Sequence, residues 1–78
     1  MKTKVHVFLK PGVLDVQGKA IEGALHSLGF SEAANVRVGK TIELDIPGDA
    51  AAAEAQARKM AEQLLANTVI ESYRVEVG

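Results

Sequence analysis

The string Gly39-Lys40-Thr41 is the part of this sequence that comes nearest to a reaction motif. A phosphate-binding loop places such a string five residues after another glycine and directly before a helix, so that backbone N–H groups wrap the anion. Position 34 holds Ala34, and the alternating apolar residues that follow Thr41 indicate a strand. Both requirements fail, so we interpret the string as a turn.

The two histidines, His6 and His26, are the next candidates, because an imidazole can act as a base or a metal ligand near neutral pH. His6 falls on the polar face of a predicted strand, and His26 falls on the outer side of a predicted helix. Neither has an aspartate or glutamate at ligand spacing on the same element. We expect both to be surface histidines.

The remaining reactive side chains are scattered. The serines have no neighbouring base and orienting group, and there is no cysteine to act as a nucleophile. Glu22, Glu54 and Glu62 fall at solvated helix positions. The sequence therefore predicts no catalytic, cofactor-binding or metal-binding residue on this chain.

Four basic residues could converge on an anion: Lys10, Arg37, Lys40 and Arg74. Four acidic residues have a pattern that would let them pair with these cations: Glu43, Asp45, Glu71 and Glu76. Charge pairs between neighbouring strands are usual on a solvated or interfacial sheet face. We therefore expect pairing and not an anion site.

The elements that position these residues belong to a short chain. Its 78 residues suffice for one domain, 1–78, and the 47% hydrophobic and 24% charged composition is that of a globular protein. A net charge of -1 excludes a nucleic-acid footprint, and no polybasic run suggests a membrane surface. The N-terminus lacks the pattern of a signal peptide, no apolar run approaches roughly 20 residues, and the absence of cysteine favours the cytoplasm.

Alternating apolar residues predict a first strand at 4–9, which Lys10-Pro11-Gly12 ends. Asp15 is a suitable N-cap for a helix to about Leu28, with Gly29 as its stop residue. Two short strands, 36–38 and 41–46, come next. We favour a tight hairpin between them and keep one long, bent strand with a bulge as the alternative.

The second half begins with Asp49, which is placed to cap a helix over 50–66. Asn67 is expected to end that helix in a left-handed conformation, and 69–77 forms the last strand. The order is β-α-β-β-α-β. It predicts a two-layer α+β fold, ferredoxin-like or related, with two helices on one face of an antiparallel sheet.

A domain this short has a thin core, so association with further copies would help to stabilise it. Two classes of function fit such a domain. One is a ligand-sensing regulatory module that binds a metabolite between protomers, and the other is an assembly subunit that joins larger partners. The fold alone does not choose between them.

Specific strings favour the second class. Three stretches resemble the signatures of the PurS family: Phe8 to Asp15 with Gln17 to Glu22; Leu28 to Phe30 with Val36 to Lys40; and Leu64 to Asn67 with Val69 to Glu71 and Tyr73. The resemblance covers essentially the whole chain. Val16 and Thr68 stand where the family usually has proline. Both departures affect local rigidity only, because neither removes a reactive group.

The resemblance implies a non-catalytic subunit of phosphoribosylformylglycinamidine synthase, an enzyme of purine biosynthesis. A glutaminase subunit of that complex releases ammonia, and a large synthetase subunit uses ATP and magnesium. The small subunit bridges the two and forms a homo-oligomer, either a dimer or a tetramer. We expect six residues to contribute to its contacts: Lys10, Pro11, Gly12, Arg37, Gly39 and Lys40.

Overall fold

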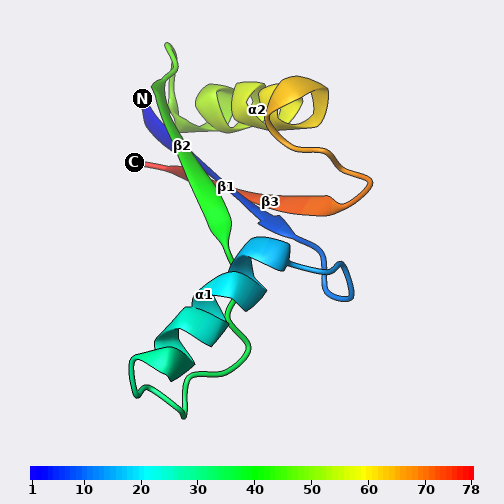
Figure 1. Ribbon diagram of the computed structural model, residues 1–78. Helices are drawn as coiled ribbons and strands as arrows, with labels where there is room; N and C mark the ends of the chain where they lie inside the picture. The colour runs from blue at the N-terminus through cyan, green and yellow to red at the C-terminus, as the bar shows by residue number, and fades with distance from the viewer.

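A computed structural model describes residues 1–78 as a three-stranded antiparallel sheet with two helices (Figure 1). The elements are β1 (Lys2–Leu9), α1 (Val16–Ser27), β2 (Gly39–Asp45), α2 (Ala50–Met60), a π-helical turn (Ala61–Leu65) and β3 (Glu71–Val77). The strand order is β2-β1-β3. The predicted α+β class with an antiparallel sheet and two helices is confirmed.

The central strand, β1, sets the two faces of the sheet. Val5 lies opposite Ile42 on β2 and Val75 on β3, and Lys4 lies opposite Glu43 and Glu76. Since successive side chains of a strand point to opposite faces, one face is apolar and the other is charged.

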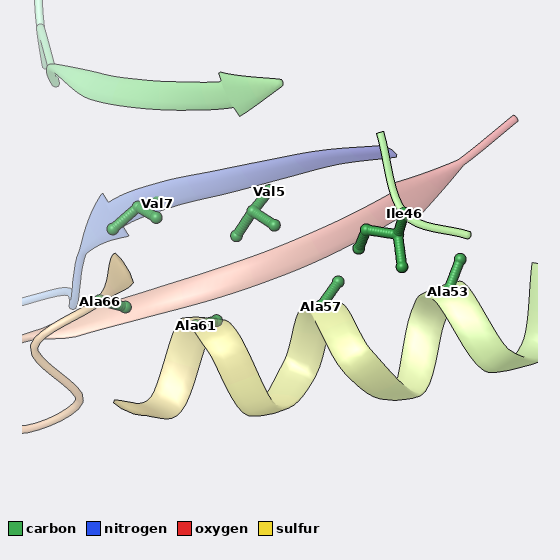
Figure 2. Close-up of a cluster of buried hydrophobic side chains, with 7 residues drawn as sticks. All are labelled: Val5, Val7, Ile46, Ala53, Ala57, Ala61 and Ala66. Carbon is green, nitrogen blue, oxygen red and sulfur yellow. The ribbon is translucent and has the colours of Figure 1, made fainter. Parts of the chain in front are cut away.

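The apolar face packs on α2 (Figure 2). Seven hydrophobic residues form the buried core: Val5, Val7, Ile46, Ala53, Ala57, Ala61 and Ala66. Four of them are alanines, which let the helix approach the sheet closely but bury little apolar area each. The predicted thin core follows from this composition, because stabilisation scales with the apolar area removed from water.

The other helix, α1, does not lie on the sheet. Figure 1 shows it running away from the end of the sheet at which β2 begins, on the side remote from α2. The molecule is consequently elongated, with extents of 48 × 25 × 14 Å. Only α2 covers the sheet within this chain, so the placement of α1 differs from the predicted pair of helices on one face.

The predicted hairpin at Gly39-Lys40 is wrong. Residues 36–38 lie outside the sheet, and β2 pairs with β1 in one unbroken register from Gly39 to Asp45. The reason is that the Val38 N–H donates to the side chain of Asp15 and not to a strand. The alternative of one continuous extended run is nearer to the structure, although without a bulge.

The ends of the second helix differ in detail. Asp49 caps α2 as predicted, accepting a hydrogen bond from the Ala52 N–H at 2.9 Å. Asn67 is not left-handed, since Asn35 is the one non-glycine residue with a positive φ. Asn67 instead forms a turn, in which its carbonyl accepts hydrogen bonds from the Ile70 and Glu71 N–H groups. None of the helices has both the length and the apolar character that crossing a membrane requires.

Candidate interaction surface

The two stretches singled out in the sequence meet at one end of the sheet. The Arg37 guanidinium donates from Nη1 to the Val13 carbonyl at 3.2 Å and from Nη2 to the Lys10 carbonyl at 3.3 Å. One side chain therefore joins the loop after β1 to the segment before β2. We call this end of the molecule, residues 10–14 and 36–40, the junction.

Lys10 binds a third segment to the junction. Its ammonium donates to the Thr68 carbonyl at 2.7 Å, and its backbone N–H donates to the Ile70 carbonyl at 2.9 Å. The loop that leads into β3 is thereby held beside the loop that leaves β1. Lys10 thus has an intramolecular contact, which its position in a predicted turn gave no reason to expect.

The other candidate residues of the junction have distinct roles. Gly12 has φ +89, a conformation that favours glycine. A Cβ on Gly39 would lie 2.8 Å from the Val7 carbonyl oxygen, so the close approach of two strands requires glycine there. Pro11 and Lys40 are exposed, and Lys40 makes no ion pair. Of the junction's cations, Lys40 is the one whose charge is free to meet a partner.

Asp15 is the feature that the sequence reasoning recognised only in part. It is 5% exposed, and its Oδ1 accepts the Gly18 N–H while its Oδ2 accepts the Val38 N–H, both at 2.7 Å. These two hydrogen bonds, Val38 first, lower the pKa of the Asp15 carboxyl, and the Arg37 guanidinium 4.0 Å away adds to the effect. The cap was predicted, but nothing in the residue type signals a second bond to Val38.

Two hollows open at the junction. One of about 370 Å³ lies between the start of α1 and the sheet, with Leu14, Val16 and Lys40 in its lining. The other, of about 590 Å³, is lined by Phe8, Leu9, Pro11, Arg37 and Val38. Apolar walls beside a free cation are typical of a protein-binding surface with a charged rim.

Large apolar side chains are unusually exposed for so small a chain. Six have more than half of their surface in solvent: Leu14 (69%), Val16 (70%), Leu28 (74%), Phe30 (61%), Leu64 (83%) and Val69 (81%). The first four lie at the two ends of α1. These two pairs of exposed apolar side chains are candidates for contact with another protein.

The four basic residues that could have converged on an anion do not form one cluster. Lys40 lies opposite Val7 on the core face of the sheet, whereas Arg74 lies opposite His6 on the charged face. The charged face does carry cross-strand pairs, with other partners than predicted: Lys4 Nζ is 3.7 Å from Glu43, and His6 Nε2 is 3.3 Å from Glu76.

The remaining candidates for chemistry stay apart. His6 Nδ1 lies 2.9 Å from the Thr41 hydroxyl, and His26 Nε2 donates to the Ala33 carbonyl at 2.6 Å. No three histidine, aspartate or glutamate side chains come together in a group that could hold a metal.

Comparison with known proteins agrees with this geometry. The family model described as "PurS: Phosphoribosylformylglycinamidine (FGAM) synthase" matches residues 2–78. The Bacillus subtilis phosphoribosylformylglycinamidine synthase subunit PurS is 50% identical over 76 residues, 97% of this chain and 90% of that protein.

Solved structures are similar over nearly the whole length. The Methanocaldococcus jannaschii PurS structure superposes with a TM-score of 0.91 at 34% identity and covers 99% of this chain and 94% of its own. A chain of the Thermotoga maritima PurLQS structure gives a TM-score of 0.85 at 30% identity, covering 96% and 93%. The protruding α1 is thus part of an arrangement that these structures share.

Proposed function

This chain belongs to the PurS family of phosphoribosylformylglycinamidine synthase subunits, and from that premise we propose that it bridges the glutaminase and the large synthetase subunits of the enzyme. The observation that carries the proposal is the exposure of large apolar side chains around α1 and the junction. A monomeric protein rarely leaves such a surface uncovered. The Thermotoga maritima relative, whose structure is that of a PurLQS complex, supports a role within an assembly.

The division of labour follows from the chemistry of ammonia. The glutaminase subunit releases ammonia from glutamine, and the synthetase subunit uses ATP and magnesium to activate the formyl amide that ammonia attacks. Ammonia in bulk water at neutral pH is mostly protonated and then no longer nucleophilic, so a closed assembly protects it. We place ATP and magnesium on the synthetase and the whole complex in the cytoplasm.

Self-association, as a dimer or a tetramer, is part of the proposal. Figure 2 shows β2 farther from α2 than β1 and β3 are, and Ile42 and Leu44 on β2 are only half-buried. Ile21 on α1 (40% exposed) and Leu28 at its C-cap lack cover. The α1 of a second copy, laid beside α2, would cover β2 and give each sheet the two helices that the sequence pattern predicts. A reciprocal contact of this kind is the usual geometry of a two-fold dimer.

The junction is the surface that we assign to the partner subunits. Pro11, Gly12 and Gly39 shape its turns, Lys10 and Arg37 hold its loops together, and Lys40 supplies the free charge. A positive charge on the rim of an apolar patch assists encounter with an acidic partner and is weakened by salt.

Reconstitution of the three subunits tests the bridge. Amidine formation is measured with glutamine and, separately, with added ammonium as the nitrogen source. A bridge is needed for the first reaction and much less for the second, because free ammonium bypasses transfer between subunits. Equal glutamine-dependent rates with and without this chain would contradict the proposal.

A pair of lysine variants tests the junction in the same assay. We expect the double variant Lys10→Ala, Lys40→Ala to lower glutamine-dependent activity near the assembly constant, with the greatest loss relative to the parent at low salt, where the charges of the parent are least screened. Lys59→Ala is the matched control, since Lys59 is an exposed lysine on α2 without an ion pair. Equal activity of the double variant and the control across a salt series would remove the junction from the interface.

A further inference from the structure

A buried carboxylate lies where α1 leaves the rest of the molecule. Asp15 is 5% exposed, although its neighbours Leu14 and Val16 are 69% and 70% exposed. Burial of a charged group is costly unless hydrogen bonds satisfy it. The two short bonds that Asp15 accepts, from Gly18 and Val38, provide that compensation.

Those two bonds connect different parts of the chain. Gly18 lies in the first turn of α1, and Val38 directly precedes β2, whose first residue, Gly39, pairs with β1. One carboxylate group therefore bonds the helix through Oδ1 and the approach to the strand through Oδ2. The orientation of α1 relative to the sheet depends on both oxygens being acceptors.

The surrounding contacts leave little freedom for the helix to turn. A Cβ on Gly18 would lie 2.5 Å from the Val36 carbonyl oxygen, so the first turn of α1 already touches the returning segment. One turn further along, Glu22 Oε1 accepts the Val36 N–H at 3.1 Å. Beyond Glu22, the one hydrogen bond from an α1 side chain to a residue outside the helix is that of His26 to Ala33. The direction of α1 is thus set at its N-terminal end, beside Asp15.

We propose that Asp15 is a positioning residue, which fixes the direction in which α1 leaves the sheet and so presents the exposed face of α1 preformed to a second copy of this chain. The part about presentation rests on the self-association proposed above, whereas the part about direction does not. Preorganisation of this kind favours binding because the ordering cost is met before the partner arrives.

The proposed role requires an aspartate at position 15 and not merely any N-cap residue. Asparagine and serine cap helices about as well as aspartate does, but each offers one acceptor oxygen. In the D15N variant the amide NH₂ would face an N–H group, either that of Gly18 or that of Val38. The carboxylate also stays ionised at neutral pH, since both hydrogen bonds lower its pKa.

Asp49 provides the matched control. It caps α2 through a single side-chain bond, from the Ala52 N–H to Oδ1, and it is exposed. Its carboxylate makes no bond outside its own helix. D49N therefore changes the same residue type at the same helix position without the second bond.

The test measures the direction of α1 in the full chain. The protein has no cysteine, so Ser27→Cys on α1 and Ala55→Cys on α2 give two unique spin-label sites. Labelled chains are diluted into excess unlabelled chain, so that only distances within one chain contribute. We expect the same narrow distance distribution in the parent and in D49N, and a broadened or shifted distribution in D15N and D15S, with helix content unchanged by circular dichroism.

A second measurement on the same variants follows self-association of the chain by sedimentation across a concentration series. If α1 has the required direction in about one chain in ten, the apparent dissociation constant rises about tenfold for each chain of the pair. A parent-like distance distribution in folded D15N and D15S would overturn the positioning role. A broadened distribution with unchanged self-association would overturn the presentation role while leaving the bridging function standing.

Discussion

The two helices begin with the same kind of N-cap, but one packs on the sheet and the other is exposed. Asp15 and Asp49 each cap a helix by accepting a backbone N–H three residues on. From that start, α2 buries Ala53 and Ala57 against the sheet, and the π-helical turn after it buries Ala61, whereas α1 buries only Gly18. The local sequence that starts a helix therefore says nothing about which surface it will cover.

The sizes of the apolar side chains account for the difference. The alanines of α2 let it lie close against the sheet within its own chain. The larger apolar residues Ile21, on α1, and Leu28, at its C-cap, remain exposed. A helix with the larger apolar side chains is the one that has the most to gain from a second protein, since the gain scales with area.

An alanine-to-leucine substitution should change the free energy of unfolding very differently on the two helices. Ala57→Leu adds volume to a fully buried site on α2 and should lower the free energy of unfolding by about 1–3 kcal/mol. Ala24→Leu, at an exposed site on α1, should change it by no more than about 0.5 kcal/mol. Urea unfolding of each variant measures both values, and a cost at Ala24 equal to that at Ala57 would show that α1 is packed within the chain.

Two glycines of α1 have different surroundings, since Gly18 lies against the returning segment and Gly23 lies on the protruding part. Gly23→Ala meets no atom within 4 Å and should stabilise the helix by about 0.5–1 kcal/mol. Gly18→Ala would place its methyl group 2.5 Å from the Val36 carbonyl oxygen and should be destabilising. Thermal unfolding gives the sign of each change. Two changes of the same sign would mean that the first turn of α1 does not touch the returning segment.

Acid unfolding should report the contribution of the Asp15 carboxylate. The pKa of Asp15 is lowered on folding, so its contribution is present above the unfolded value of about 3.9 and is lost as the pH falls through the lower folded value. The unfolding midpoint of D15N should therefore fall less steeply below pH 4 than that of the parent. An identical slope for D15N and the parent would contradict the assignment.

The sequence alone predicted the three strands that form the sheet and the N-cap of each helix. These follow from local patterns, such as the alternation along β1 and the type of residue at Asp15 and Asp49. The failures lie where a distant group decides the local structure. Residues 36–38 read as a strand by their alternation, but Asp15 takes the Val38 N–H that a strand would need.

The position of α1 was beyond local reasoning for a similar reason. An apolar stripe such as Ile21, Leu25 and Leu28 predicts that a helix will be covered, but it does not say by which chain. The meeting of Lys10 with Arg37 was also invisible, because the bonds join a guanidinium to backbone carbonyls, for which sequence carries no signal. The sequence grouped Lys10 with Arg37 as possible members of a basic cluster and through the resemblance to the PurS family, and neither argument pointed to these bonds.

The contrast between the helices implies that α2 stabilises the fold of its own chain, whereas α1 is stabilised by contact with another chain. Hydrogen exchange of the backbone amides measures this directly, first in the isolated chain at low concentration and then in the reconstituted three-subunit complex. Since exchange reports local opening, α2 should be protected in both samples, and the amides of α1 should exchange quickly in the first and slowly in the second. Equal exchange of α1 in the two samples would contradict the account.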